Sequence, residues 1–181
     1  MRILVTGANG FVGKNLCAQL NNIKDGKARC YGDVTVEAVY EYDLDSTPEQ
    51  LDEYCKNADF VFNLAGVNRP QNQEEFMQGN FGFASTLLDT LKKHGNTCPV
   101  MLSSSQQASL TGRFGNSEYG RSKKAGEDLF LEYGKDTDAR MLIYRFPNLF
   151  GKWCIPTTTV PWLPSATPLP TTCLTPSTTP V

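Results

Sequence analysis

The sequence predicts an α/β fold, in which one doubly wound parallel β-sheet is covered by helices on both faces. Three observations predict it. Short apolar runs typical of buried strands alternate along the chain with longer segments of helical periodicity. A glycine-rich turn joins the first of these runs to the first helical segment. The chain has 181 residues, 40% of them apolar and 20% charged, which suits a soluble domain with a sizeable core.

The start of the chain predicts two strands and the helix between them. RILVT, residues 2–6, is a buried-strand pattern, and GANG breaks it before a segment with one apolar helical face. Residues 21–34 are polar and contain glycine, so we expect a loop there. EAVYEYD, residues 37–43, then has the pattern of a second strand.

A capping motif and an apolar run predict the next helix and strand. Ser46 and Glu49 form an S-x-x-E capping box, and Pro48 suits the first turn of a helix that we expect to reach about residue 56. DFVFNLAG, residues 59–66, is the third strand. A long helical pattern follows, from Phe76 to Leu91.

The last expected elements are two strands and one helix. PVMLSSS, residues 99–105, is the fourth strand, and residues 117–134 have a helical pattern. ARMLIYRFPNLFG contains a fifth strand that ends at Pro147. Strands and helices that alternate in this way predict a parallel sheet.

Three glycines between the first strand and the first helix suggest a phosphate site. Gly7, Gly10 and Gly13 lie in VTGANGFVG. Glycine at such positions permits a tight turn, a close approach of backbone to a pyrophosphate, and packing of the helix on the strand, while helix N-terminal amides attract negative charge. A plain glycine-rich turn is the alternative, because the pattern alone is weak.

Two further motifs carry groups able to do chemistry. Ser103 to Ser105 end the fourth strand, where doubly wound sheets place ligands, although a polar strand exit would look the same. Tyr119 and Lys123 are four residues apart in YGRSK, so they share one face of a helix. We expect the Lys123 ammonium to lower the pKa of the Tyr119 phenol toward working pH. A solvated helix often carries such a pair without function.

In combination these motifs resemble the extended short-chain dehydrogenase/reductase family, also described as the NAD-dependent epimerase/dehydratase family. Its GxxGxxG pattern and its Ser/Thr, Tyr and Lys catalytic group match VTGANGFVG, SSS and YGRSK, and further matches are NLAG, GNFGFASTLLD and YRFPNLFG. The resemblance covers residues 1 to about 154. It implies a Rossmann-type sheet, here without the usual C-terminal substrate domain.

Within that family, NLAGVNRP, SSSQQA and PNLFGKWC look most like the capsular-polysaccharide reductases. Those enzymes reduce a 4-keto UDP-deoxy-N-acetylaminosugar on the route to UDP-N-acetyl-L-fucosamine, and a zinc-binding cupin domain follows their reductase domain. This chain shows no cupin pattern, so we expect no metal. The resemblance implies NADP or NAD as cofactor and a UDP-linked deoxyaminosugar as substrate, and it is compatible with a homodimer.

The resemblance also implies roles for individual residues. Tyr119 would give its proton to the 4-keto oxygen as NAD(P)H delivers hydride, Lys123 would hold the ribose and tune Tyr119, and Ser105 would position the carbonyl, with Ser104 as the alternate. The expected cofactor-binding residues are Gly7, Asn9, Gly10, Phe11, Val12, Gly13, Asp43, Leu44, Leu64, Ala65, Gly66, Asn80, Ser103, Tyr119, Lys123, Phe146 and Pro147. The expected substrate contacts are Val67, Asn68, Ser105, Gln106, Arg145 and Asn148.

Asp43 and Asp45 leave the form of the cofactor open. An acidic side chain at the end of the second strand would bind an adenine ribose 2′-hydroxyl and disfavour a 2′-phosphate, which favours NAD. The segment that begins with DLDS also resembles the family's adenine-contacting segment, and the capsular reductases use NADPH. A solvated acidic turn is the third interpretation.

Charge and cysteine usage exclude several classes of protein. The net charge is −2 and basic residues form only doublets, which argues against a nucleic-acid binder. We see neither a secretory signal nor an apolar run near the roughly 20 residues of a membrane span. Six cysteines without a CxxC pattern suggest reduced, mostly buried thiols. We therefore expect a cytoplasmic protein that binds neither nucleic acid nor membranes.

The composition changes abruptly after residue 154. Residues 155–181 hold seven of the eleven prolines and nine threonines but no charged residue, so they cannot continue an α/β domain. We expect a dinucleotide-binding domain at 1–154 and an irregular tail at 155–181. A Pro/Thr linker is one interpretation of that tail.

A frameshift is the other interpretation. The capsular reductases continue after FGKWC approximately as xPNYNSAVATFCHA, and codons for that peptide read in a shifted frame spell PTTTVPWLPSAT, which is residues 156–167. We therefore expect a one-base slip near codon 155 and a truncated chain. The rival function is then a dinucleotide-binding protein without catalysis, either a remnant or a redox sensor.

Overall fold

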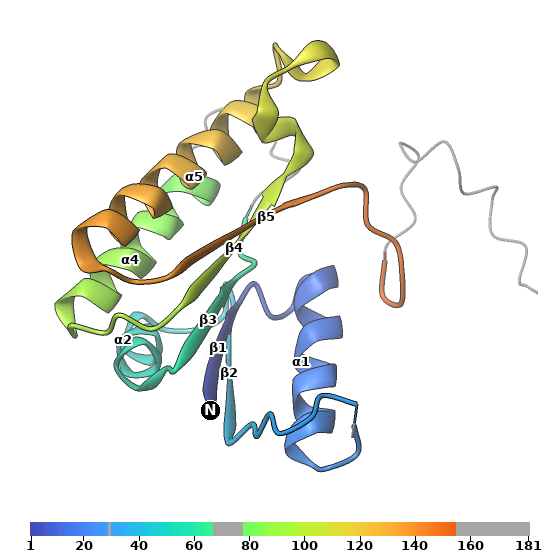
Figure 1. Ribbon diagram of the computed structural model, residues 1–181, viewed down its shortest axis with the longest axis vertical. Helices are drawn as coiled ribbons and strands as arrows, with labels where there is room; N and C mark the ends of the chain where they lie inside the picture. The colour runs from blue at the N-terminus through green and yellow to red at the C-terminus, as the bar shows by residue number, and fades with distance from the viewer. Residues whose placement is uncertain (29, 67–77, 155–181) are drawn as a thin grey trace, which may run out of the picture.

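The computed structural model describes residues 1–28, 30–66 and 78–154. Within this part of the chain, the strands form a single parallel sheet in the order β2-β1-β3-β4-β5 (Figure 1). The strands are β1 (Arg2–Thr6), β2 (Ala38–Tyr42), β3 (Phe60–Asn63), β4 (Val100–Ser105) and β5 (Met141–Phe146). The predicted fold class is confirmed.

The helices divide between the two faces of the sheet. They are α1 (Phe11–Lys24), α2 (Pro48–Asn57), α4 (Phe83–Lys93) and α5 (Glu118–Thr137). Helix α1 lies on one face, while α2, α4 and α5 lie on the other (Figure 1). The reason is that the chain moves one way from β1 to β2 and the opposite way from β2 through β3 and β4 to β5, and right-handed crossovers then place the helices on opposite faces. The crevice between the carboxyl ends of β1 and β3 is the switch point at which such sheets bind ligands.

The core has two parts because side chains alternate along each strand. Leu4 belongs to the part covered by α2, α4 and α5, together with the fully buried Phe130. Ile3 and Val5 face the other way and pack against α1 through residues such as Leu20. Strand β1 is therefore buried on both faces, which anchors the glycine turn that follows it.

Two boundary predictions were wrong. Helix α1 continues to Lys24, into the expected loop, because Ile23 packs on the core beneath the helix. The capping box of α2 uses Thr47 and Gln50: the Thr47 hydroxyl accepts the Gln50 amide at 3.3 Å, and the Gln50 side chain accepts the Thr47 amide at 2.8 Å. This frame puts Pro48 at the first helical position, where its missing amide costs nothing.

Ser46, the expected N-cap of α2, has another role in the structure. The Ser46 hydroxyl accepts the Asp43 amide at 3.0 Å instead. A π-turn, Gln78–Gly82, leads into α4, and the expected start of this helix at Phe76 lies outside the described residues. The tail at 155–181 also lies outside them. Of the five cysteines in the described part, two are buried and Cys30 is exposed.

No helix in residues 1–28, 30–66 and 78–154 is long and apolar enough to cross a membrane.

Candidate functional site

A cavity of about 400 Å³ opens at the carboxyl ends of β1, β2 and β3. Seven of the expected cofactor residues line it, namely Gly7, Gly10, Asp43, Leu44, Leu64, Ala65 and Gly66. The remaining lining residues, which the sequence did not predict, are Tyr42, Ser46, Gly79 and Phe83. The Tyr42 and Phe83 rings stack with centroids 5.8 Å apart. The two rings form an apolar wall of the cavity and come from segments distant in sequence. The one sequence signal for this wall is that Tyr42 directly precedes the predicted cofactor residue Asp43.

The glycine turn is packed too tightly for side chains. Gly7 has φ of 70°, and a Cβ added there would lie 2.7 Å from the Ala65 nitrogen. A Cβ on Gly13 would lie 2.1 Å from the Gly7 carbonyl oxygen. These contacts bring α1 close to the ends of β1 and β3. The first turn of α1 has neither a side-chain cap nor an acidic residue, so its positive dipole end suits an anion.

Asp43 ties the end of β2 to the glycine turn. Its carboxylate accepts the Asn9 amide at 2.7 Å and its neighbour Leu44's amide at 2.8 Å. The Asn9 side chain lies 3.5 Å from Asp45. Asp43 thus lies at the cavity where the sequence predicts it, with backbone amides as its partners.

Thr6 and Asn63 join the ends of β1 and β3 below the cavity. The Thr6 hydroxyl donates to the Asn63 side-chain oxygen at 2.7 Å and accepts the Ala65 amide at 3.3 Å. Both polar side chains are buried. They hold the β3 exit against the glycine turn, a role that nothing in their local sequence pattern signalled.

The three serines at the end of β4 have three different partners on α5. The Ser103 carbonyl accepts a hydrogen bond from the Lys123 amine at 3.2 Å. The Ser105 side chain is hydrogen-bonded to Tyr119. Ser104 is buried, and its hydroxyl donates to Glu127 at 2.6 Å. Ser105 is therefore the serine beside the phenol, and the choice of Ser104 as its alternate is wrong, because side chains alternate along a strand.

The N-terminus of α5 approaches the turn that follows β4 closely at Gly120. A Cβ there would lie 2.4 Å from the Gln107 carbonyl oxygen. Ser117 caps the helix by accepting the Gly120 amide at 2.9 Å, and its hydroxyl donates to the Gln107 side chain at 2.7 Å. These contacts fix Tyr119, the residue before Gly120, against the turn that follows Ser105.

Burial changes the acidity of both α5 groups. Burial lowers the pKa of Lys123 to about 8. Burial also raises the pKa of Tyr119 above its ordinary value, and the hydrogen bond with Ser105 offsets only part of this rise. The expectation that Lys123 lowers the pKa of Tyr119 is wrong for this structure. The Lys123 amine lies 5.8 Å from the centroid of the Tyr119 ring, and both groups lose solvation.

The expected residues on and after β5 are placed as follows. Arg145 donates to both carboxylate oxygens of Glu127, through Nε at 2.8 Å and Nη2 at 2.6 Å. Phe146 pairs in register with Ser105, and the exposed Pro147 and Asn148 follow it. The structure therefore gives Arg145 a protein partner, whereas the sequence analysis assigns it to substrate.

The other expected residues in the described part lie near the start of α1 and after β4. Asn9, Phe11 and Val12 lie in the glycine turn and the first turn of α1, and Gln106 is exposed directly after β4. Val67 and Asn68 lie outside the described residues, as does the side chain of Asn80.

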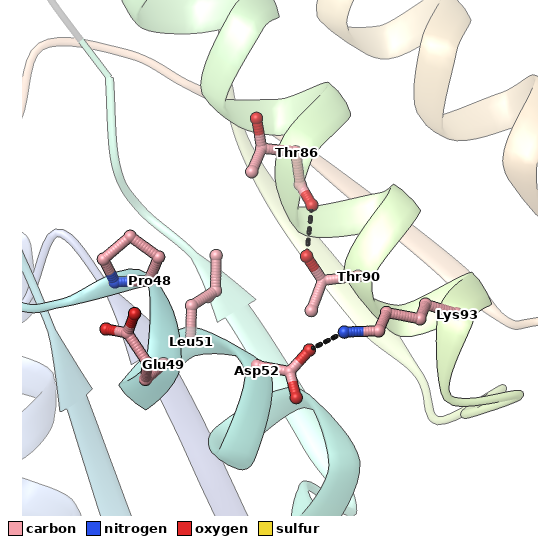
Figure 2. Close-up of a pocket in the computed structure, with 7 residues that line it drawn as sticks. All are labelled: Pro48, Glu49, Leu51, Asp52, Thr86, Thr90 and Lys93. Carbon is pink, nitrogen blue, oxygen red and sulfur yellow. Dashed lines mark hydrogen bonds and ion pairs between the residues drawn. The ribbon is translucent and has the colours of Figure 1, made fainter.

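A second hollow lies between α2 and α4 and contains none of the expected site residues (Figure 2). Asp52 pairs there with Lys93 at 2.6 Å, and the nearby His94 ring nitrogen lies 3.0 Å from the same carboxylate oxygen. The hydroxyl of Thr90 bonds to the Thr86 carbonyl within the helix. Since Asp52 and Lys93 pair with each other and none of the expected residues lines it, this hollow is a poorer candidate for the site.

The model of the NAD dependent epimerase/dehydratase family matches residues 3–163 of the chain. The chain belongs to this family. The family assignment agrees with the glycine turn, the cavity and the Ser105, Tyr119 and Lys123 cluster described above. The expected family is confirmed.

Proteins of known name are similar to most of this chain. The chain is 40% identical over 156 residues to UDP-2-acetamido-2,6-beta-L-arabino-hexul-4-ose reductase from Pseudomonas aeruginosa, an alignment that covers 86% of this chain and 38% of that protein. A crystal structure of capsular polysaccharide assembling protein CapF from Staphylococcus aureus is 39% identical with a TM-score of 0.67, covering 88% of this chain and 39% of that one. MoeE5 in complex with UDP-glucose and NAD is 25% identical with a TM-score of 0.58, covering 79% of this chain and 52% of that one.

Proposed function

We propose that this chain is the dinucleotide-binding part of an NAD(P)H-dependent reductase for a nucleotide-activated keto sugar in capsular or surface polysaccharide biosynthesis. The names of the Pseudomonas and Staphylococcus relatives support this function. The chain spans 38% and 39% of their lengths, so the sugar and the activity are both part of the proposal. A cytoplasmic homodimer belongs to the same proposal and rests on the family resemblance alone.

The observation that carries the proposal is the position of the glycine cradle, residues 7–13, at the same edge of the parallel sheet as Ser105 and its hydrogen-bond partner Tyr119. The cradle fits a dinucleotide. A Cβ at Gly7 or Gly13 would clash with backbone atoms, so only glycine allows the tight turn and the close packing of α1 that a pyrophosphate site requires. The α1 N-terminus would hold the pyrophosphate, and Asp43 and Leu44 would contact the adenosine half. When bound, NAD(P)H supplies a hydride.

Tyr119 is the proposed general acid. Burial keeps its pKa above the ordinary value, so the phenol holds its proton at neutral pH and can donate it as a sugar carbonyl oxygen gains negative charge. Ser105, bonded to Tyr119, would position that oxygen. Lys123, which donates to the Ser103 carbonyl, would bind the ribose hydroxyls of the cofactor.

The first test is titration of the full chain with NADH and NADPH, followed by fluorescence and thermal melting. We expect saturable binding of at least one of them. A folded chain that responds to neither at millimolar concentration would contradict the dinucleotide site.

The second test concerns the reaction. Residues 1–154 would be joined in frame to the part of the Pseudomonas relative that follows its matching region. We expect this chimera to reduce the relative's UDP-linked keto sugar, and Tyr119→Phe to lower kcat by about 10²-fold or more, because general acids contribute on this scale. An unchanged kcat in the Phe variant would show that Tyr119 is not the acid.

The rival function is a dinucleotide-binding protein without catalysis. The cavity at the glycine turn supports this alternative, because dinucleotide binding needs no catalytic group. It predicts that the full chain binds the cofactor but does not itself reduce the sugar.

A further inference from the structure

Glu127 is a buried carboxylate that the proposed reaction does not use. It is 2% exposed, and it accepts hydrogen bonds from Ser104 on β4 and from Arg145 on β5. Burial alone would raise its pKa, but the bonds from Arg145 and Ser104 outweigh burial and lower the pKa below its ordinary value. The carboxylate is therefore ionised at neutral pH and joins three elements of the fold.

The spacing on α5 places Glu127 on the same face as the proposed reactive groups. Tyr119, Lys123 and Glu127 follow one another at intervals of four residues. Each contacts one member of a run of consecutive serines on β4, which are Ser105, Ser103 and Ser104 respectively. The first two of these contacts belong to the proposed site, and the third connects that face of the helix to the sheet.

The contact of Glu127 with Ser104 and Arg145 is better suited to orienting α5 on the sheet than to stabilising the fold. A buried ion pair is weak evidence for stability, since apolar side chains of similar volume often serve as well. A bidentate contact between a guanidinium and a carboxylate is directional, however, and fixes the orientation of both groups. Ser104 adds a third direction from the neighbouring strand. Together these bonds restrict both the rotation of α5 and its depth on the sheet.

We propose that Glu127 is a positioning residue, which through Ser104 and Arg145 sets α5 so that the Lys123 amine and the Tyr119 hydroxyl meet the end of β4. This inference rests on the proposed function. It also assigns to Arg145 the task of orienting Glu127. Gly120 fixes the other end of the same helix face by its close contact with Gln107.

The test compares two ligands on the full chain. NADH or NADPH, whichever binds better, would span both the glycine cradle and Lys123, whereas ADP, or 2′-phospho-ADP for an NADPH binder, would occupy the cradle alone. We expect Glu127→Gln to raise the Kd of the whole cofactor by about tenfold or more, because small displacements of positioned groups are costly. The Kd of the fragment should change by less than about twofold, because Glu127 contacts β4 and β5, whereas the cradle follows β1 and β3 lies between β1 and β4.

Asp128→Asn is the matched control. Asp128 is the next residue on α5 and is exposed; its carboxylate pairs with Lys124 at 2.5 Å and acts on Arg145 through charge alone, without a hydrogen bond. The Asp128→Asn substitution removes a carboxylate and an ion pair but no hydrogen bond to β4 or β5. We therefore expect the Kd of the whole cofactor and the Kd of the fragment to stay unchanged.

The outcomes separate this inference from the function on which it rests. If Glu127→Gln does not fold, Ser104→Ala takes its place as the test variant. It keeps the pair of Glu127 and Arg145 and removes only the bond to β4. We expect the same difference between the whole cofactor and the fragment. Equal weakening of both ligands, or no weakening of either, overturns the positioning role. A wild-type chain that binds neither ligand overturns the proposed function as well.

Discussion

At the scale of single residues, Lys123 shows how the site costs the fold stability. This residue is 9% exposed, and its amine donates a hydrogen bond to the Ser103 carbonyl at 3.2 Å. Burial lowers the pKa from 10.5 to about 8, so at neutral pH the folded protein holds a charged amine in an environment that disfavours it. Below pH 8 this group therefore opposes folding.

Replacement of Lys123 by Met keeps the length of the side chain and removes the amine. We expect Lys123→Met to raise the free energy of unfolding at pH 7 by about 1–3 kcal/mol, from the size of the pKa shift. Between pH 8 and 10.5 the folded lysine has lost its proton while the unfolded chain still binds it. The wild type gains stability with pH in this window, so the advantage of Met should shrink there.

Urea unfolding at pH 7 and pH 10 measures this difference. Lys124→Met, at a side chain 37% exposed, is the control for the loss of a lysine from α5 that is not buried. A Met variant that is less stable than wild type at pH 7 would contradict the argument, as would an advantage that is constant with pH.

At the scale of elements, close backbone contacts dock the helices that build the site. Gly13 docks α1 on the glycine turn, and Gly120 docks the start of α5 on the turn after β4. In contrast, a Cβ added at Gly126, in the middle of α5, would meet nothing within 4 Å. The two helices thus contain glycines of opposite tolerance.

Gly13→Ala and Gly126→Ala form a matched pair that tests this difference. We expect Gly13→Ala to abolish cofactor binding and to destabilise the chain, because its methyl group would overlap the Gly7 and Ala8 carbonyl oxygens. Gly126→Ala should stabilise by about 0.5–1 kcal/mol, the usual gain for this change within a helix. Thermal melts measure the change in stability, and cofactor titration measures the change in affinity. Wild-type affinity in Gly13→Ala would refute the proposed dinucleotide site.

At the scale of the whole molecule, helices cover the two faces of the sheet unequally. Within the described residues, α1 is the single helix on its face of the sheet, while α2, α4 and α5 lie on the other (Figure 1). Beyond β5, the large apolar side chains of Leu149, Phe150 and Trp153 are exposed, with Phe150 at 88%. The matching region makes up 38% and 39% of the lengths of the Pseudomonas and Staphylococcus relatives.

The domain boundary at residue 154 stays a prediction. The prolines of residues 155–181 lack the amides that helices and sheets need, so we expect that segment to add no stability. A chain that ends at Cys154 should melt within about 2 °C of the full chain, a shift that corresponds to less than about 1 kcal/mol. Limited proteolysis with mass spectrometry should find the first cuts after residue 154. Resistance to cleavage together with a much lower melting temperature on truncation would make the segment part of the fold.

The sequence by itself determined the features that depend on local pattern. Apolar periodicity distinguishes strands from helices, so the order of elements and the parallel sheet were predictable, and the glycines that permit the turn after β1 were visible as residue types. The capping box was misplaced by one residue, between Ser46 and Thr47, because both hydroxyls fit the motif and only the position of Pro48 in the helix distinguishes them.

Only the tertiary structure decided which of these groups act together. The face of β4 on which each serine lies separates Ser105, beside Tyr119, from Ser104, beneath α5. The partner of Arg145 is 18 residues away in sequence, on another element. The pKa of Tyr119 rises because folding buries the phenol, a loss of solvation that no spacing between Tyr119 and Lys123 encodes. Burial and long-range contact belong to the packed chain, so they could be known only once its elements were assembled.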